Sequence, residues 1–228
     1  MLYNFYIMKL PVIITNSKNY HTSYGEKGRK IVELHKKIVQ ELGVSMAVAV
    51  PITDLQDMAN LVDIPIFAQH VDAVTHGSST GHILPEAVKE AGAFGTLLNH
   101  SEHRLSMDVL EKSIKRAKEV GLFVVACCES PEEGAEIVKF GPDLVAFEPR
   151  ELIGGDISVS TAKPEVIKQA VQLIGEGKVL VGAGVKNSED VRIALHLGAV
   201  GVLLASGVMK AEDPEAVLRD LGGGMKDQ

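Results

Sequence analysis

The residues that could do chemistry lie where short apolar runs of this sequence end. Glu148 follows the run 144–147, which is typical of a strand buried on both faces of a parallel sheet, and Pro149 comes next. Because proline has no N–H for the ladder and holds the preceding residue extended, we expect the strand to stop at this carboxylate. Gly154-Gly155 then allows close backbone approach to an anion. Taken alone, a glutamate at a strand end is more often an exposed acid than a catalytic one, so the other strand ends must decide.

Other apolar runs also end in polar or glycine-rich segments. A cation, amides, a histidine and two glycine-containing turns follow them, at Asn16-Ser17-Lys18, Gln69-His70, Asn99-His100-Ser101-Glu102, Gly182-Ala183-Gly184 and Ala205-Ser206-Gly207. Each segment has an ordinary interpretation by itself: Lys18 as a solvated charge, His100 as a hydrogen-bonded core residue, and the glycines as tight turns. Their occurrence together at the ends of successive strands indicates one functional site.

The elements that position these residues alternate between buried strands and amphipathic helices. We expect strands over residues 12–16, 47–50, 64–68, 94–98, 122–126, 144–147, 179–181 and 200–204. We expect helices over residues 27–41, 54–61, 85–92, 107–120, 131–140 and 164–174, and a further helix capped by Ser188 that ends near residue 197. This alternation predicts the α/β class and a single (β/α)₈ barrel, with functional groups at the carboxyl ends of the strands. A doubly wound open sheet is the alternative, although no GxGxxG motif follows the first strand.

Length and composition fit one domain that acts on a small molecule. The chain has 228 residues, 46% apolar and 23% charged, and its net charge of −7 argues against a nucleic-acid or membrane-surface partner. No apolar run of 18 residues is present, so we expect no spanning helix. Cys127 and Cys128 lie in an apolar run without metal-ligand spacing, so we interpret them as core thiols of a reducing, cytoplasmic compartment. We expect residues 1–8 to be a short extension and residues 9–228 the catalytic barrel.

The motifs at the strand ends resemble those of the triosephosphate isomerase family. They are Asn16-x-Lys18, His100-Ser101-Glu102 and Phe147-Glu148-Pro149, with Leu152-Ile153-Gly154 after them. The resemblance extends in order through the whole chain and is greatest to the shorter archaeal form. Two departures are Ser17, where an aromatic residue is common, and His103, where a basic residue is common. They put the packing below Lys18 and a peripheral ion pair in question, but not the reacting groups.

This resemblance implies a TIM-barrel enzyme that interconverts dihydroxyacetone phosphate and D-glyceraldehyde 3-phosphate through an enediolate, in glycolysis and gluconeogenesis. The family is itself the standard example of a glutamate base paired with a neutral histidine, and these roles carry over to Glu148 and His100. His100 would be neutral because a backbone N–H near Glu102, at a helix start, donates to it. Lys18 would supply a fixed positive charge with Asn16 as a further donor, and Glu102 would orient Lys18. No metal and no organic cofactor is implied.

The resemblance also implies the remaining substrate-binding residues, which would hold the phosphate mainly through backbone N–H groups. They are Ile153, Gly154, Gly182, Ala183, Gly184, Ala205 and Ser206. Residues 149–163 would form a lid that excludes water and keeps the enediol phosphate from losing phosphate.

The resemblance implies self-association as well. Thr80 lies in a long loop after the third strand, and in the family this loop inserts beside the first-strand lysine of a neighbouring subunit, near Asn16 and Glu102 of the partner subunit. An ordinary exposed loop is the alternative. The helix expected over 131–140 is short, so we expect the apolar side chains of Ile137, Val138 and Phe140 to be able to pack against a second dimer. We therefore expect a homotetramer built from two dimers, with a homodimer as the alternative.

Two rival functions share part of this pattern. Other phosphosugar barrels, such as epimerases and indole- or thiamine-forming synthases, also carry phosphate-binding turns, but a metal-dependent epimerase needs His and Asp ligands at several strand ends, and the spacing here offers none. A catalytically silent barrel that serves only in assembly would tolerate the loss of Glu148, His100 or Lys18, and all three are present.

Overall fold

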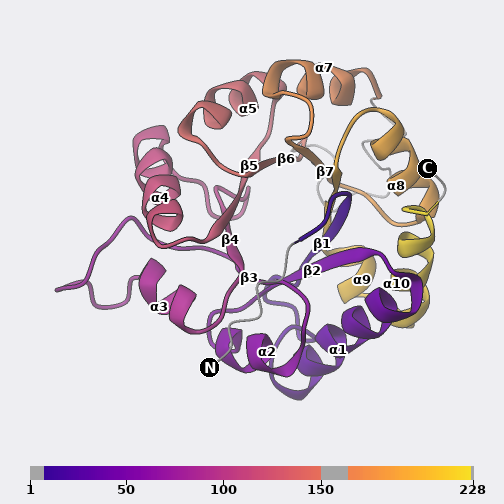
Figure 1. Cartoon of the computed structure of the whole chain (residues 1–228), viewed down its shortest axis with the longest axis horizontal. Coiled ribbons are helices and arrows are strands. Elements are labelled where there is room, and N and C mark those ends of the chain that lie inside the picture. Colours follow the sequence, from indigo (N-terminus) through magenta and orange to yellow (C-terminus); the bar gives the residue numbers. More distant parts are fainter. Residues whose placement is uncertain (1–7, 150–163, 227–228) are drawn as a thin grey trace.

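The computed structural model describes residues 8–149 and 164–226, in which eight parallel strands close into a barrel (Figure 1). The strands pair in chain order and β8 pairs with β1, which closes the ring. This closure confirms the predicted (β/α)₈ barrel and rules out the open sheet. The strands are β1 (Val12–Asn16), β2 (Ser45–Val50), β3 (Ile66–Ala68), β4 (Gly95–Leu98), β5 (Phe123–Cys128), β6 (Leu144–Phe147), β7 (Val179–Gly182) and β8 (Gly201–Leu204).

Helices surround the barrel as an outer ring (Figure 1). They are α1 (Gly25–Leu42), α2 (Leu55–Leu61), α3 (Pro85–Glu90), α4 (Met107–Glu119), α5 (Pro131–Ile137) with the 3₁₀ turn η1 (Val138–Phe140), α7 (Pro164–Ile174), α8 (Ser188–His196), α9 (Ser206–Met209) and α10 (Pro214–Gly223). The prediction that Ser188 caps a helix was wrong by one residue. Asn187 is the cap, because its side chain accepts the N–H of Asp190, and Ser188 is the first helical residue. Helices α9 and α10 were not predicted.

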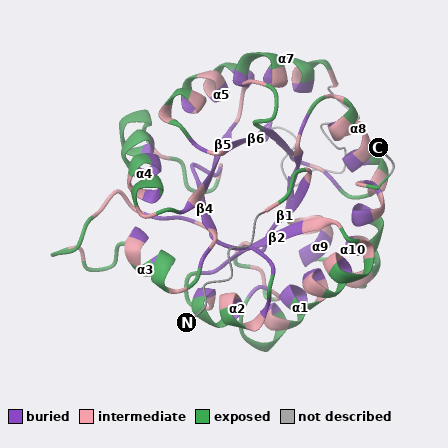
Figure 2. Ribbon diagram, in the orientation of Figure 1, coloured by how far each residue is buried: buried purple, intermediate pink, exposed green. Residues whose placement is uncertain are grey.

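The strands of the barrel are buried (Figure 2). Their side chains alternate between the two faces, so the buried residues form an inner and an outer cluster. In β6, Leu144 and Ala146 point into the barrel, whereas Val145 and Phe147 pack against the helices. The next residue along this alternation, Glu148, therefore faces the barrel interior. In β5 the same rule separates the two buried free thiols, Cys127 inward and Cys128 outward.

Three further predictions from the sequence can be compared with the structure. Met8 packs against the inner cluster, so the predicted extension contributes one residue to the barrel. Ile137 is fully buried within its own barrel, so it is not available to a second dimer, whereas Val138 and Phe140 are half-buried. None of the described helices is both long and apolar enough to cross a membrane.

Candidate active site

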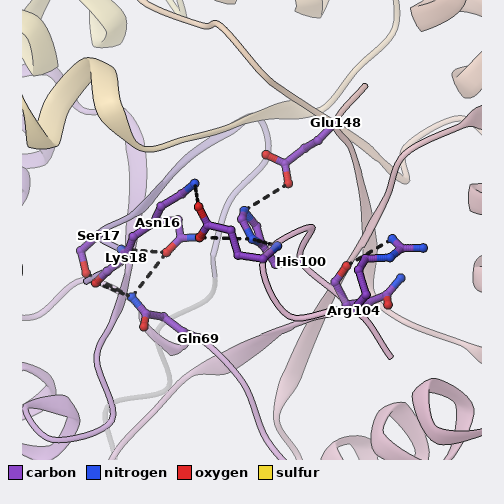
Figure 3. Close-up of polar contacts among 9 residues, drawn as sticks. Asn16, Ser17, Lys18, Gln69, His100, Arg104 and Glu148 are labelled. Atoms are coloured by element: carbon purple, nitrogen blue, oxygen red, sulfur yellow. Dashed lines mark hydrogen bonds and ion pairs between the residues drawn. The ribbon is translucent and has the colours of Figure 1, made fainter. Parts of the chain in front are cut away.

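Glu148 and His100 meet at the carboxyl ends of β6 and β4 (Figure 3). The Nε2 atom of His100 lies 3.7 Å from Oε2 of Glu148, and both side chains are buried. The N–H of Glu148 donates to the carbonyl of Cys128 at 2.9 Å, which holds the carboxylate at the end of the barrel. Its Oε2 has no hydrogen-bond partner among the described residues. This oxygen is therefore placed to accept a proton from a bound molecule.

The surroundings of Glu148 make its carboxylate a stronger base. Burial raises the pKa of this carboxyl from 4.5 to about 7, because the charged form loses its hydration. The positive charge of Lys18 and the Cys127 thiol lower the pKa, and Glu102 raises it, but burial dominates. A carboxylate with this pKa suits general-base catalysis near neutral pH.

His100 is a neutral hydrogen-bond donor. Its Nδ1 accepts the N–H of Glu102 at 3.2 Å, so the ring proton lies on Nε2, the atom that faces Glu148. The pKa of His100 is lowered to about 4, mainly by burial and also by the positive charge of Lys18, while the Glu102 carboxylate opposes both. The donor was expected at a helix start, and this was wrong. Glu102 lies in a turn closed by the His103 N–H and the His100 carbonyl, and α4 begins only at Met107.

Lys18 supplies the fixed positive charge at the end of β1. Its Nζ donates to Oε1 of Glu102 at 2.8 Å, and the lysine side chain is 14% exposed while that of Glu102 is 60% exposed. Lys18 has a left-handed backbone with φ of 48°, and its N–H donates to Oδ1 of Asn16 at 3.0 Å. Gln69 braces this conformation by donating from Nε2 to the Lys18 carbonyl at 3.0 Å (Figure 3). Asn16, Lys18 and Glu102 are thus brought together as the sequence suggested.

Ser17 and His103, the two departures from the motif pattern, both contact neighbouring residues of the site. Ser17 is buried, its carbonyl accepts the Ser23 hydroxyl, and its own hydroxyl lies 3.4 Å from Nε2 of Gln69. The ring of His103 packs on the ring of His70 with centroids 4.2 Å apart. Both substituted positions are therefore in contact with neighbouring strand ends.

The glycine-rich turns face the same cavity from the opposite side of the barrel. The cavity is lined by residues of both halves: Asn16, Lys18, Tyr20, His100, Glu148, Ala183, Gly184, Val185, Lys186, Leu203, Leu204, Ala205 and Ser206. Ala205 precedes α9, which Ser206 begins, and the first N–H groups of a helix have no partner within it.

Gly182 is not among the lining residues of this cavity; it ends β7 and backs the carboxylate. A Cβ atom there would lie 2.6 Å from Oε1 of Glu148, so the absence of a side chain makes room for the base.

Ile153, Gly154 and the rest of the predicted lid beyond Pro149 lie outside the described residues. Thr80 is exposed on the segment between β3 and α3, which Figure 1 shows extending away from the barrel. Two hydrogen bonds hold the two ends of this segment together. The N–H of Ile83 donates to Oδ2 of Asp72 at 2.6 Å, and the N–H of Asp72 donates to the Ile83 carbonyl.

The sequence placed Gln69 and Asn99 among the strand-end residues but assigned them no role, and it indicated only a core thiol for Cys127. All three lie at or just beyond a strand end, which is the signal that selected Lys18 and His100. The described residues contain no group of three or more His, Cys, Asp or Glu side chains arranged to hold a metal ion. A base with an unpaired oxygen, a neutral acid and a fixed cation around one cavity suit proton transfer beside a carbonyl group.

Comparison with known proteins places this site in a family. The family model described as triosephosphate isomerase matches residues 11–221. The triosephosphate isomerase of Methanosarcina barkeri is 46% identical over 218 residues, which cover 94% of this chain and 98% of that protein. That of Metallosphaera sedula is 44% identical over 220 residues, covering 95% and 96%. The crystal structure of triosephosphate isomerase from Bartonella henselae superimposes with a TM-score of 0.70 at 19% identity, over 91% of this chain and 97% of that one, a likeness of fold.

Proposed function

The chain belongs to the triosephosphate isomerase family, whose glycolytic reaction interconverts dihydroxyacetone phosphate and D-glyceraldehyde 3-phosphate, and we propose that Glu148, His100 and Lys18 carry out this reaction here. The observation that carries these roles is the pair formed by the unpaired Oε2 of Glu148 and Nε2 of neutral His100, 3.7 Å apart. Moving a proton between adjacent carbons requires a base for the C–H group and a donor for the neighbouring oxygen, and this pair supplies both.

The steps follow from the protonation states of the two groups. Oε2 of Glu148 removes a proton from C1 of dihydroxyacetone phosphate, and the C–H electron pair moves into an enediolate whose charge lies on the former carbonyl oxygen. Nε2–H of His100 donates to that oxygen, and Lys18 stabilises the negative charge. His100 gives its Nε2 proton to that oxygen and takes the proton of the C1 hydroxyl in return, which moves the negative charge to the oxygen on C1. The Glu148 carboxylic acid then returns a proton to C2, so that the C1 carbonyl of the aldehyde forms and the carboxylate is restored. His100 acts here as a neutral imidazole, because its pKa is lowered to about 4 and the ring is therefore uncharged near neutral pH.

The phosphate group would lie against the opposite side of the cavity. We assign its contacts to backbone N–H groups of Ala183, Gly184, Ala205 and Ser206, whose position at turns and at the start of α9 supports anion binding. Ile153, Gly154 and the lid remain part of the same proposal on sequence grounds. The part of Gly182 would be indirect, through the space that it leaves for Glu148.

A coupled assay tests the function directly. Purified protein is given D-glyceraldehyde 3-phosphate together with NADH and an enzyme that reduces dihydroxyacetone phosphate, and NADH loss is expected. Running the reaction in D₂O distinguishes the chemistry, since a proton held by Glu148 exchanges with solvent and deuterium enters the product. Absence of turnover would overturn the function, and turnover without deuterium would overturn the enediolate route.

We also propose that the protein forms a homotetramer of two dimers, with the homodimer as the alternative. The dimer is supported by a groove of about 610 Å³ lined in part by Lys18, Gln69 and Glu102, which offers a place for a loop of a second copy. The segment proposed to enter this groove is the exposed loop that carries Thr80 in the second copy. Support for the second interface rests on half-buried Val138 and Phe140, because Ile137 is enclosed.

The remaining proposals concern the setting of the enzyme. Two buried, unpaired thiols fit a cytoplasmic location, since reducing compartments keep thiols free. The motif wording favours the shorter archaeal form of the family. We propose that residues 1–8 form a short extension, whose last residue Met8 packs on the barrel, and that residues 9–228 form the catalytic barrel.

A further inference from the structure

The direction of the His100 side chain departs from the alternation of its own strand. In β4, Leu97 points into the barrel and Leu98 points out to the helix layer. Continued as a strand, the chain would send Asn99 inward and His100 outward, away from Glu148. His100 faces the barrel mouth instead, so the backbone must turn between Leu98 and His100.

The turn occurs at Asn99, which has a left-handed backbone with φ of 59°. Among residues with a side chain, asparagine tolerates this region best, whereas alanine at such a position is strained by about 1 kcal/mol. The side chain of Asn99 is 1% exposed, so its polar atoms must find partners within the protein. The residue thus combines an unusual backbone with a buried amide.

Both ends of that amide are bonded. Nδ2 donates to the Cys127 carbonyl on β5 at 3.0 Å, and Oδ1 accepts the N–H of Leu105 at 3.0 Å. The first bond joins the end of β4 to the end of β5. The second closes the loop that contains His100 and Glu102. The carbonyl of Asn99 also accepts from Nη1 of Arg104 at 3.5 Å.

The strand that Asn99 holds also holds the base. The carbonyl next along β5, that of Cys128, accepts the N–H of Glu148. His100 and Glu148 are therefore tied to adjacent peptide groups of the same strand, one through Asn99 and one directly. A shift of the Asn99 amide would change the separation between Nε2 and Oε2, which is now 3.7 Å.

We propose that Asn99 is a positioning residue that turns His100 into the active site and sets its distance from Glu148, an inference that rests on the catalytic roles proposed above. Each variant isolates one part of this role. Asn99→Gly keeps the left-handed backbone but removes the amide. Asn99→Asp keeps the acceptor for Leu105 but cannot donate to the Cys127 carbonyl. Asn99→Ala loses the amide and strains the backbone.

The control variant is Asp143→Ala, which removes a comparable bond at the opposite end of the same strand. Oδ2 of Asp143 accepts the N–H of Val124 at 2.7 Å, near the amino-terminal end of β5. Asn99→Gly is expected to lower kcat by about 10- to 100-fold, the loss that a misplacement near 1 Å produces, with KM changed less than about 3-fold. Asp143→Ala is expected to leave kcat within about 2-fold even where it lowers the melting temperature as much. Equal losses of kcat in the two variants would overturn the proposal, as would parental kcat in Asn99→Gly.

A double-mutant cycle distinguishes a residue that positions His100 from one that only stabilises the fold. In a His100→Gln background, Asn99→Gly should cost no further kcat, because the residue that it positions is already absent. An undiminished, additive loss would overturn the proposal. If Asn99→Gly does not fold, Asn99→Asp takes its place in the same cycle, with the same two outcomes. Failure of the catalytic roles themselves is recognised separately, because His100→Gln alone would then retain parental kcat.

Discussion

The Nε2 atom of His100 lies 3.7 Å from Oε2 of Glu148, although the two residues follow β4 and β6, which do not pair with each other. Strand β5 lies between them, and its last two carbonyls accept the Asn99 side chain and the Glu148 backbone. The acid and the base are thus spaced by one strand of the barrel. The expected effects of changing each group follow from this arrangement.

Removing the basicity of Glu148 should stop proton abstraction while leaving the shape of the site. We expect Glu148→Gln to lower kcat by roughly 10²–10⁴-fold, the usual contribution of a general base, with a far smaller change in KM. Steady-state kinetics measure this. Turnover within a few-fold of the parent would mean that another group is the base.

The pH profile of kcat/KM should follow the Glu148 carboxyl. Its pKa is raised to about 7 and only the ionised form is a base, so kcat/KM should rise as pH increases through about 7. Protonation of His100 should not intervene, because its pKa is lowered to about 4. The profile is measured from pH 5 to 9, with Glu148→Asp as the comparison to separate this carboxyl from the substrate phosphate, which titrates near ~6. A flat profile would contradict the assignment.

In the proposed reaction, Lys18 would face an anion in both the ground state and the transition state. Lys18→Ala should therefore raise KM and lower kcat together, with a loss of kcat/KM of roughly 10²–10³-fold. Glu102→Gln removes the ion-pair partner but leaves the lysine charge, and since Glu102 is largely exposed we expect a loss below about 10-fold. Unchanged kinetics in Lys18→Ala would place this charge outside the reaction.

His35 should make the fold sensitive to acid. The ring is buried, Nδ1 donates to the Ile31 carbonyl and Nε2 accepts the Thr15 hydroxyl, both at 2.7 Å, and burial lowers its pKa from 6.5 to about 4. The unfolded chain therefore binds this proton first, so the stability contributed by neutral His35 is complete above pH 6.5 and is lost as pH falls towards 4. The loss between pH 7 and pH 5 is roughly 2 kcal/mol. Urea unfolding of the parent and of His35→Gln at both pH values measures the difference, in which other titrating groups such as Glu148 cancel. An equal pH dependence in both proteins would contradict this role.

Assembly can be measured without any variant. For the tetramer, light scattering should give a mass about four times the 24.4 kDa of one chain. For the alternative dimer, it should give about twice the mass of one chain. Thr80→Arg should reduce association and kcat together, because the loop would no longer fit beside Lys18 of the partner subunit. A fully active monomer would contradict both assemblies.

Much of the fold follows from local sequence patterns. The order of strands and helices could be predicted because buried parallel strands are continuously apolar and surface helices repeat every three to four residues. The predicted bounds of β1, β6 and α7 agree with the structure, since Asn16, Pro149 and Pro164 are clear ends and starts. The inward direction of Glu148 also follows from the sequence, because strand alternation is regular up to that residue. The motifs of the strand ends identified the family.

Other features were decided only by the closed barrel. The direction of His100 depends on the left-handed turn at Asn99, which strand alternation alone does not predict and which contacts on β5 stabilise. The close approach of Gly182 to Glu148 depends on the pairing of β7 with β6, and Ile137 is enclosed only when its helix packs on the barrel. Local sequence determines which residues end each strand, because periodicity and proline act over a few residues. Distances between those ends are fixed by long-range packing and hydrogen bonds, which form only when the eight strands close.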